Sequence, residues 1–309
     1  MNTSRRLSNA LASLLLGIVL SGGEGIAAEA DAAAGSLPAD YREQIEDWRQ
    51  RRHERLASQD GWLTLVGLEW LKQGENRIGN LDSSDVKVAG GPEEWGAVVV
   101  NGDTLRFIPA VGAAVTVDGA PATETVLVAD AHGDPTVVRS GDLSFHVIFR
   151  ESYALRIKDR NAPALVAFDG VDNYPIDPAW RIDARFIPAP DGRTIDIGNV
   201  LGQLSPMSVL GTVEFEREGR VYRLLGLGEE GSDSIWFLFA DRTTGRETYG
   251  AGRFLYSDGM PADGRVVVDF NKAYNPPCAF NDYSTCPLPP QENRLDLAVT
   301  AGEKDYHQH

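Results

Sequence analysis

Apolar residues between positions 39 and 58 recur at the spacing of one helical face. They are Tyr41, Ile45, Trp48 and Leu56, and charged residues fill most positions between them. Apolar residues that recur every three or four positions are typical of an amphipathic helix, so the pattern predicts a helix over residues 39–58 that packs on a sheet. His53 lies among arginines, and we expect it to be solvated on the polar face of this helix.

From Gly61 to about residue 160 the pattern changes to short apolar runs separated by glycine and by Asn or Asp. The runs predict strands at residues 62–71, 86–88, 96–100, 104–108, 114–117, 125–128, 143–150 and 153–158. Asn101-Gly102-Asp103 and Asp118-Gly119 are typical hairpin turns, because these residues tolerate the left-handed backbone that such turns require. Short strands at this regular spacing predict a β-sandwich over residues 61–160.

A second series of strands follows Asn161-Ala162-Pro163, the expected domain boundary. The strands are predicted at residues 180–187, 208–215, 221–225, 235–239, 247–256, 266–270 and 295–300. Short connections between them favour an antiparallel meander that is long enough to curl into an open barrel. The sequence therefore predicts a mainly β protein with an N-terminal helix, a β-sandwich and an antiparallel, barrel-like β domain over residues 161–309.

The first 30 residues have the pattern of an export signal. Arg5-Arg6 forms a basic start, residues 10–20 form an apolar run that is too short to span a bilayer, and Ala28-Glu29-Ala30 matches a cleavage site. We therefore predict a signal peptide over residues 1–30, then a linker and the helix within residues 31–60. The mature protein would be periplasmic or secreted and not membrane-bound; a retained N-terminal anchor is the alternative.

Charge and motifs exclude several classes of partner and cofactor. The formal net charge of −16 argues against nucleic acid and anionic membrane surfaces, which would repel the chain. The sequence has no G-x-S-x-G or H-E-x-x-H motif. Residues 226–231 match G-x-G-x-x-G, but a strand rather than a helix is predicted after them, so we expect a hairpin loop and no nucleotide cofactor.

A segment rich in proline and cysteine, residues 271–294, interrupts the second series of strands. It contains five prolines and both cysteines of the chain, Cys278 and Cys286. Proline cannot donate to a sheet, so the segment predicts a stiff loop. In an oxidising compartment, two cysteines eight positions apart indicate a local disulfide. Free thiols and a metal pair remain as alternatives, although the sequence offers no nearby histidine to complete a zinc site.

Polar residues flank this loop and form the predicted ligand site. Tyr249 and Arg253 lie four positions apart on one strand, and the glycines between them favour close backbone approach. The predicted ligand-binding residues are Tyr249, Arg253, Asp269, Asn271, Asn275, Asn293 and Glu303. A purely structural interpretation stays open, in which Arg253 pairs with Asp269 and the asparagines cap turns.

Three functions agree with these residues. The first is the binding of a small polar or charged ligand at the mouth of the barrel-like domain, with Arg253 as a charge-assisted donor. The second is a hydrolase that uses Asp269 or Glu303 as general acid or base. The third is a module that holds another envelope protein through the sandwich. No motif specifies a metal or another cofactor, so we predict none.

Several motifs resemble those of a known family. They are Asp241-Arg242-Thr243-Thr244-Gly245, Thr248-Tyr249-Gly250-Ala251-Gly252-Arg253, and the segment from Asn275-Pro276-Pro277-Cys278 to Cys286-Pro287-Leu288-Pro289-Pro290. These motifs are similar to the domain of unknown function 1684 (DUF1684) family, and Gly61-Trp62-Leu63 and Gly74-Glu75-Asn76 resemble its N-terminal half. The family is functionally uncharacterised, so the resemblance implies an architecture and this choice of loop but no reaction.

The segment from Trp70 to Asn80 resembles the opening of a forkhead-associated (FHA) domain, and Thr116-Val117-Asp118-Gly119 resembles a turn of the same fold. This resemblance implies an FHA-like sandwich. Phosphothreonine recognition does not carry over, because Asn80 stands where the family has arginine. Glu93 and Glu94 in the next loop would also repel a phosphate group.

Overall fold

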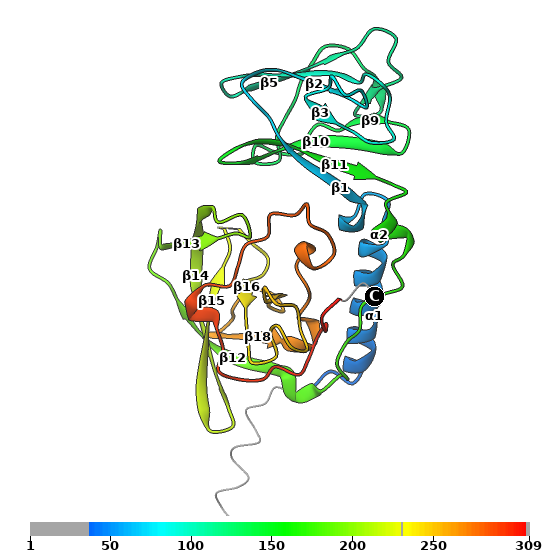
Figure 1. Ribbon diagram of the computed structural model, residues 1–309. Helices are drawn as coiled ribbons and strands as arrows, with labels where there is room; N and C mark the ends of the chain where they lie inside the picture. Colours follow the sequence, from blue (N-terminus) through cyan, green and yellow to red (C-terminus); the bar gives the residue numbers. More distant parts are fainter. Residues whose placement is uncertain (1–36, 230, 307–309) are drawn as a thin grey trace, which may run out of the picture. The chain divides into compact units, whose positions relative to one another are not determined.

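The computed structural model describes residues 37–229 and 231–306, in which most regular structure is β (Figure 1). The predicted signal peptide over residues 1–30 lies outside the described residues. Over the described part of the chain, no helix is long and apolar enough to cross a membrane. The prediction of a mainly β fold that starts with one amphipathic helix is confirmed.

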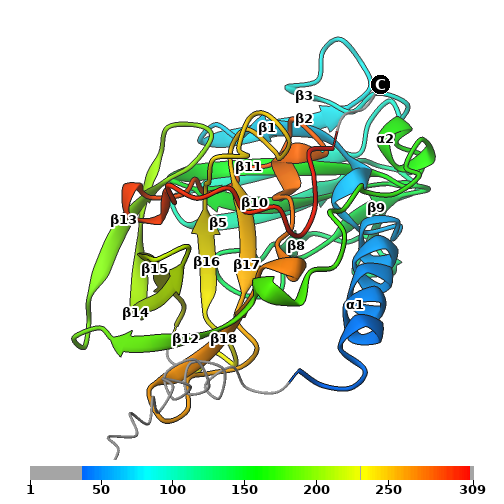
Figure 2. The same cartoon turned by 90° about the horizontal axis from the view of Figure 1, so that it is seen from below.

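The long helix α1 (Tyr41–Leu56) begins two residues after and ends two residues before its predicted bounds. Tyr41, Ile45 and Leu56 are buried, and the half-buried Trp48 lies with its ring centre 6.4 Å from that of Tyr274. The apolar face therefore packs on the C-terminal half of the chain, as the helical spacing predicts. In Figures 1 and 2, α1 (blue) runs beside the orange segment that follows β18.

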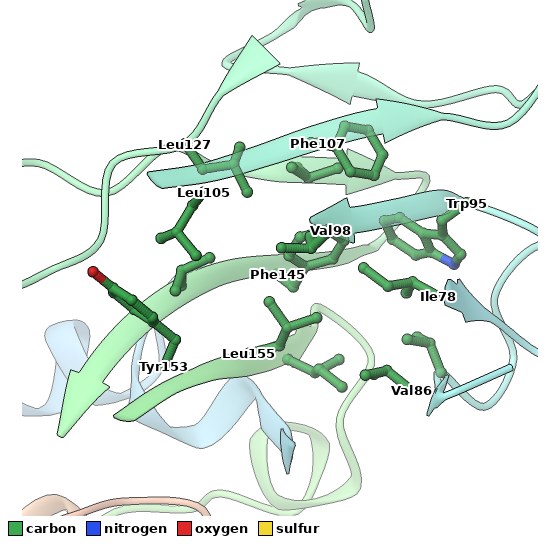
Figure 3. Close-up of a cluster of buried hydrophobic side chains, with 14 of the residues drawn as sticks. Ile78, Val86, Trp95, Val98, Leu105, Phe107, Leu127, Phe145, Tyr153 and Leu155 are labelled. Carbon is green, nitrogen blue, oxygen red and sulfur yellow. The ribbon is translucent and has the colours of Figure 1, made fainter. Parts of the chain in front are cut away.

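Two sheets form the first half of the chain. The first has the order β1 (Leu65–Trp70), β11 (Ser152–Asp159), β10 (Leu143–Arg150), β9 (Val138–Ser140), β6 (Thr116–Val117) and β7 (Ala120–Pro121). The second has the order β3 (Val86–Lys87), β2 (Gly74–Gly79), β4 (Gly96–Asn101), β5 (Thr104–Pro109) and β8 (Thr125–Val126). Apolar side chains from both sheets share one core, in which Trp95 and Phe107 pack on Phe145 (Figure 3). The regular strand spacing therefore correctly predicts two packed sheets.

Two tight hairpins confirm the predicted turns. Gly102-Asp103 connects β4 to β5, since Asn101 pairs with Thr104. Asp118-Gly119 connects β6 to β7 with φ values of 48° and 82°, the left-handed pair that a two-residue turn requires. The closer likeness to a forkhead-associated domain remains a prediction.

One antiparallel sheet organises the second half. Its order is β17 (Arg253–Tyr256), β16 (Trp236–Phe239), β15 (Arg220–Leu227), β14 (Leu204–Arg217), β12 (Arg181–Pro188) and β18 (Arg265–Asp269), and β13 (Thr194–Gly198) pairs with β14 off this path. The strand β14 is 14 residues long and has an irregular register with β15 between Val209 and Gly211. Such an irregularity bends a strand, and the sheet curls around a core that contains Phe237, Phe239 and Phe270.

The remaining elements are short. They are η1 (Trp62–Thr64), α2 (Pro163–Val166), η2 (Pro178–Trp180), η3 (Phe270–Lys272), η4 (Pro277–Ala279) and η5 (Gln291–Asn293). In the segment that matches G-x-G-x-x-G, Gly226 and Leu227 end β15, and Gly228, Glu229 and Gly231 lie before β16, as predicted. The strands β2, β7, β9 and β13 were not among those predicted from the sequence.

Three strand predictions differ most from the structure. Residues 62–64 form η1, and of residues 247–256 the last four form β17. Residues 295–300 join no sheet; instead, Leu295 N donates to the Ala240 carbonyl at 2.8 Å. The error has a physical cause, because Leu295, Leu297 and Val299 are buried at every second position. Such alternation occurs in a strand, but here it belongs to an extended segment laid against the core.

Polar contacts from the β10–β11 side of the first sheet join it to the second half. Arg150 Nε donates to Thr285 Oγ1 (3.2 Å), and Gln203 Nε2 donates to the Arg150 carbonyl (2.9 Å). Arg156 is buried, and its Nη2 reaches the same threonine hydroxyl at 3.4 Å. Figure 1 shows this side of the sheet facing the C-terminal half. The two halves therefore meet across a basic interface.

His146 lies on β10 directly opposite Arg156 of β11. Burial lowers the pKa of His146 to about 4. The positive charges of Lys158, Arg156 and Arg150 also lower this pKa, whereas the negative charge of Asp130 raises it. The unfolded chain takes up a proton on this histidine near its ordinary pKa, whereas the folded chain does not. The contribution of His146 to stability is therefore fully present above the ordinary pKa and is lost as the pH falls.

We expect His146 to lower the free energy of unfolding by on the order of 3 kcal/mol as the pH falls from 6.5 to about 4. His146→Gln should remove most of this decrease, whereas His132→Gln, at an exposed histidine, should retain it. Urea unfolding curves at several pH values measure the difference. An unchanged pH profile in His146→Gln would contradict the prediction.

Candidate functional site

Arg253 holds the C-terminal segment against the curled sheet. The side chain is fully buried, and Nη2 donates to Asp241 Oδ2 at 2.9 Å. Its other bonds reach three backbone carbonyls within residues 299–303. Arg253 therefore pairs with a buried aspartate, as the structural interpretation expects, but this aspartate is Asp241 and not Asp269. These contacts support a structural role, and ligand binding by Arg253 remains an untested prediction.

Gly252 and Asn293 also serve the backbone of the second half. Gly252 has a φ of +90°, and a Cβ there would lie 2.6 Å from the Phe239 carbonyl oxygen, so the turn into β17 requires glycine. Asn293 Oδ1 accepts from Leu225 N (2.6 Å), and its Nδ2 donates to the carbonyls of Leu225 and Leu238 (2.9 Å each). The Asn293 amide thus joins β15 and β16 at positions where these two strands do not hydrogen-bond to each other directly.

The first turn of α1 is fixed by a buried network at the end of β18. The Tyr41 hydroxyl lies 2.9 and 3.0 Å from the two carboxylate oxygens of Asp269. Asn271 donates its backbone N–H to Asp269 Oδ1 (3.0 Å) and its side-chain Nδ2 to the Tyr41 hydroxyl (2.9 Å). Burial raises the pKa of Asp269, and the hydrogen bonds from Asn271 and Tyr41 oppose this rise. Two predicted site residues therefore meet, but they anchor a helix.

A second network fixes the middle of α1. Arg52 Nε lies 2.9 Å from Glu303 Oε1, and these side chains are 12% and 1% exposed. The other oxygen of Glu303 accepts from Asn275 N at 2.6 Å, and Arg52 Nη2 donates to the Asn275 carbonyl at 2.9 Å. The guanidinium of Arg52 also lies over the Tyr274 ring, 4.8 Å from its centre. Glu303 and Asn275 therefore meet as a pair, with a helix arginine that the sequence did not indicate.

The two predicted acid–base candidates, Asp269 and Glu303, belong to different networks. Both oxygens of Asp269 accept from Tyr41, and those of Glu303 accept from Arg52 and Asn275. An acid–base pair requires two titratable groups that converge on one pocket. The observed arrangement gives the hydrolase hypothesis no geometric support.

Tyr249 and the disulfide position the proline-rich loop. The predicted bridge between Cys278 and Cys286 is present, with the Cα atoms 6.1 Å apart. The Tyr249 hydroxyl donates to the Cys278 carbonyl at 3.0 Å. This residue, too, has a partner within the chain.

A cavity of about 370 Å³ lies against α1. Its lining includes Arg49, Arg52 and His53 of α1, together with Gly170, Asn173 and Glu303. Of the seven predicted ligand-binding residues, all of which are described, Glu303 lines this cavity and the other six do not. Nowhere in residues 37–229 and 231–306 do three His, Cys, Asp or Glu side chains form a group that could hold a metal ion.

His53 forms part of the cavity wall, so the prediction that it is solvated was wrong. It is half-buried, and its ring stacks on that of Phe168 with the centres 5.0 Å apart. Gly170 lies beside it with a φ of +126°, and a Cβ there would lie 3.6 Å from His53 Nδ1. The segment after Phe168 covers a helix face that appears polar in the sequence.

Two residues that line the cavity each have a buried polar atom without a partner among the described residues. Arg49 Nη2 donates to the Tyr174 carbonyl (2.9 Å), while its Nε is buried without a partner among the described residues. Asn173 Nδ2 donates to the Val171 carbonyl (2.9 Å), and within the same residues its buried Oδ1 accepts from no donor. An unsatisfied buried polar atom costs about 1–3 kcal/mol.

Sequence reasoning did not single out Arg49 or Asn173. For Arg49 a signal existed, since Ile45, Arg49, Arg52 and Leu56 follow one another at intervals of four, three and four. Two arginines therefore occupy the buried face of the helix. Burial lowers the pKa of Arg49, and Glu46 and Glu303 oppose this change. For Asn173, which lies in a loop, no local pattern distinguishes it from a turn residue.

Comparisons with known proteins agree with the motifs around the loop. Residues 166–304 match the model of a family described as protein of unknown function (DUF1684). The solution NMR structure of an uncharacterized protein from gene locus rrnAC0354 of Haloarcula marismortui is 31% identical; the match covers 46% of this chain and 80% of that chain, with a TM-score of 0.39. The comparison with curated proteins finds no match. Asn173 and Glu303 lie inside the range matched by the family, and Arg49 lies before it.

We expect Arg253→Met to lower the free energy of unfolding by about 3–5 kcal/mol, because it leaves the buried Asp241 carboxylate without its partner. Arg242→Met is the matched control, since Arg242 pairs with Asp296 at the surface, where both side chains are more than half exposed. The control should cost about 1 kcal/mol or less. Urea unfolding measures both changes, and equal costs would contradict the structural role of Arg253.

Proposed function

Because this chain belongs to the DUF1684 family, whose function is unknown, we propose a function from its own cavity: the protein binds a small anionic ligand beside α1. The unpaired Nε of Arg49 carries this proposal. A guanidinium presents its donors in a planar fork that suits carboxylate and phosphate groups. Since Nη2 is held by the Tyr174 carbonyl, the orientation of this fork is fixed before a ligand arrives.

The charges around the cavity favour an anion at Arg49. Arg52 and Glu303 pair with each other at 2.9 Å, so their charges largely cancel. Glu46 lines the cavity from an exposed position on α1, where solvent screens it. Arg49 therefore remains as the half-buried positive charge that a ligand can approach, although the whole chain has a formal net charge of −16.

This proposal keeps the small charged ligand predicted from the sequence and moves its binding group from Arg253 to Arg49. Glu303 belongs to both sites, but its two oxygens are occupied, so we assign it a positioning role. We also retain export to the periplasm or outside the cell as a proposal. The Cys278–Cys286 disulfide supports it, because such bonds persist in oxidising compartments.

We expect Arg49→Gln to weaken the binding of propionate or inorganic phosphate at least tenfold, because hydrogen bonds to a charged group contribute about 1.5–3 kcal/mol. Titration of 15N-labelled protein, followed at the backbone amide of Tyr174, measures the affinity. Arg51→Gln is the matched control, because Arg51 is exposed, lies two positions after Arg49 on the same helix and does not line the cavity.

The control should bind both anions as the wild type does. Failure of both anions to shift the Tyr174 resonance in the wild type would overturn the proposed function. Equal affinities of Arg49→Gln and Arg51→Gln would do the same.

A further inference from the structure

We propose that the ligand is a carboxylic acid with a hydrogen-bond donor on the adjacent carbon, an α-hydroxy or α-amino acid. This inference rests on the proposed function and names the chemical class of the ligand. It follows from Asn173, which lines the same cavity as Arg49 and whose buried amide oxygen has no donor among the described residues.

Only the oxygen of the Asn173 amide is without a partner among the described residues. The Val171 carbonyl lies 2.9 Å from the Asn173 amide nitrogen, and a carbonyl requires a donor. The Nδ2 group must therefore point toward Val171, which leaves Oδ1 as the free atom. An acceptor in this position selects a hydroxyl or an ammonium group and gains nothing from a second carboxylate.

The backbone around Asn173 is held on both sides, so the acceptor has a fixed position. Asn173 forms an antiparallel bridge with Glu303. Tyr174 N donates to the Gly302 carbonyl (2.9 Å), and Lys304 N donates to the Asp172 carbonyl (2.8 Å). Pre-positioned groups bind with less loss of conformational entropy, and this arrangement is therefore suited to recognition.

Arg49 and Asn173 are linked through adjacent residues. The Arg49 guanidinium is bonded to the carbonyl of Tyr174, the residue that follows Asn173. The two residues are therefore neighbours in the lining of one cavity of about 370 Å³. A carboxylate and a donor on the neighbouring carbon satisfy both groups at once, whereas a simple acid leaves Oδ1 unpaired.

The test compares three acids that differ only in the substituent on the carbon next to the carboxylate: propionate, racemic lactate and racemic alanine. Affinities come from the Tyr174 amide shift in the wild type, in Asn173→Ala and in Asn173→Asp, which keeps an acceptor. We expect lactate or alanine to bind wild type about tenfold more tightly than propionate, because Oδ1 then gains its donor. If lactate binds more tightly than propionate, the ligand carries a hydroxyl group; if alanine does, it carries an ammonium group.

In Asn173→Ala the preference should disappear while propionate still binds, which also shows that the variant is folded; Asn173→Asp should retain the preference. Equal affinities of the three acids for the wild type would overturn the inference and leave the proposed function intact. A preference that persists in Asn173→Ala would overturn it as well. If none of the three acids binds, both the inference and the proposed function fail.

Discussion

The buried ion pair between Arg52 and Glu303 is the contact on which the site depends. It fixes α1 against the C-terminal segment, and the cavity exists because the helix is held there. A buried pair of this kind adds little net stability compared with apolar packing, but loss of one partner is costly. Its main effect is therefore to specify one position for the helix, which in turn sets where Arg49 presents its free donor.

Polar side chains replace regular strand pairing in the segment after β18. Residues 270–303 contain short helical turns but no strand, so their backbone groups need other partners. Arg253 and Glu303 supply such partners from buried positions: Arg253 donates to the carbonyls of Val299, Ala301 and Glu303, and Glu303 accepts from Asn275 N. The same density of polar residues that suggests a binding site in the sequence is thus largely a means of holding an irregular segment in place.

The fold class follows from the sequence because the periodicity of a helix or strand is a local property. The helix was predicted to within two residues of α1 at each end for this reason, and the two tight turns and the disulfide were likewise predicted from local residue patterns. Partners are not local: Arg253 could pair with Asp269 or Asp241, and only the folded chain decides between them. His53 appears polar until the segment after Phe168 covers it. Arg49 was missed because it is one of several arginines in a charged helix. Only a comparison of its position with those of the apolar residues Ile45 and Leu56 places it on the buried face.

The separation of partners along the chain has a consequence for the order of folding. Tyr41 contacts Asp269 across 228 positions, and Arg52 contacts Glu303 across 251. Contacts between such distant residues form late, because the intervening chain must first be brought together. The helix thus leaves the ribosome well before its partners Asp269 and Glu303. A chain that stops before Glu303 can still form most strands, but it leaves Arg52 without its carboxylate and the cavity without one wall.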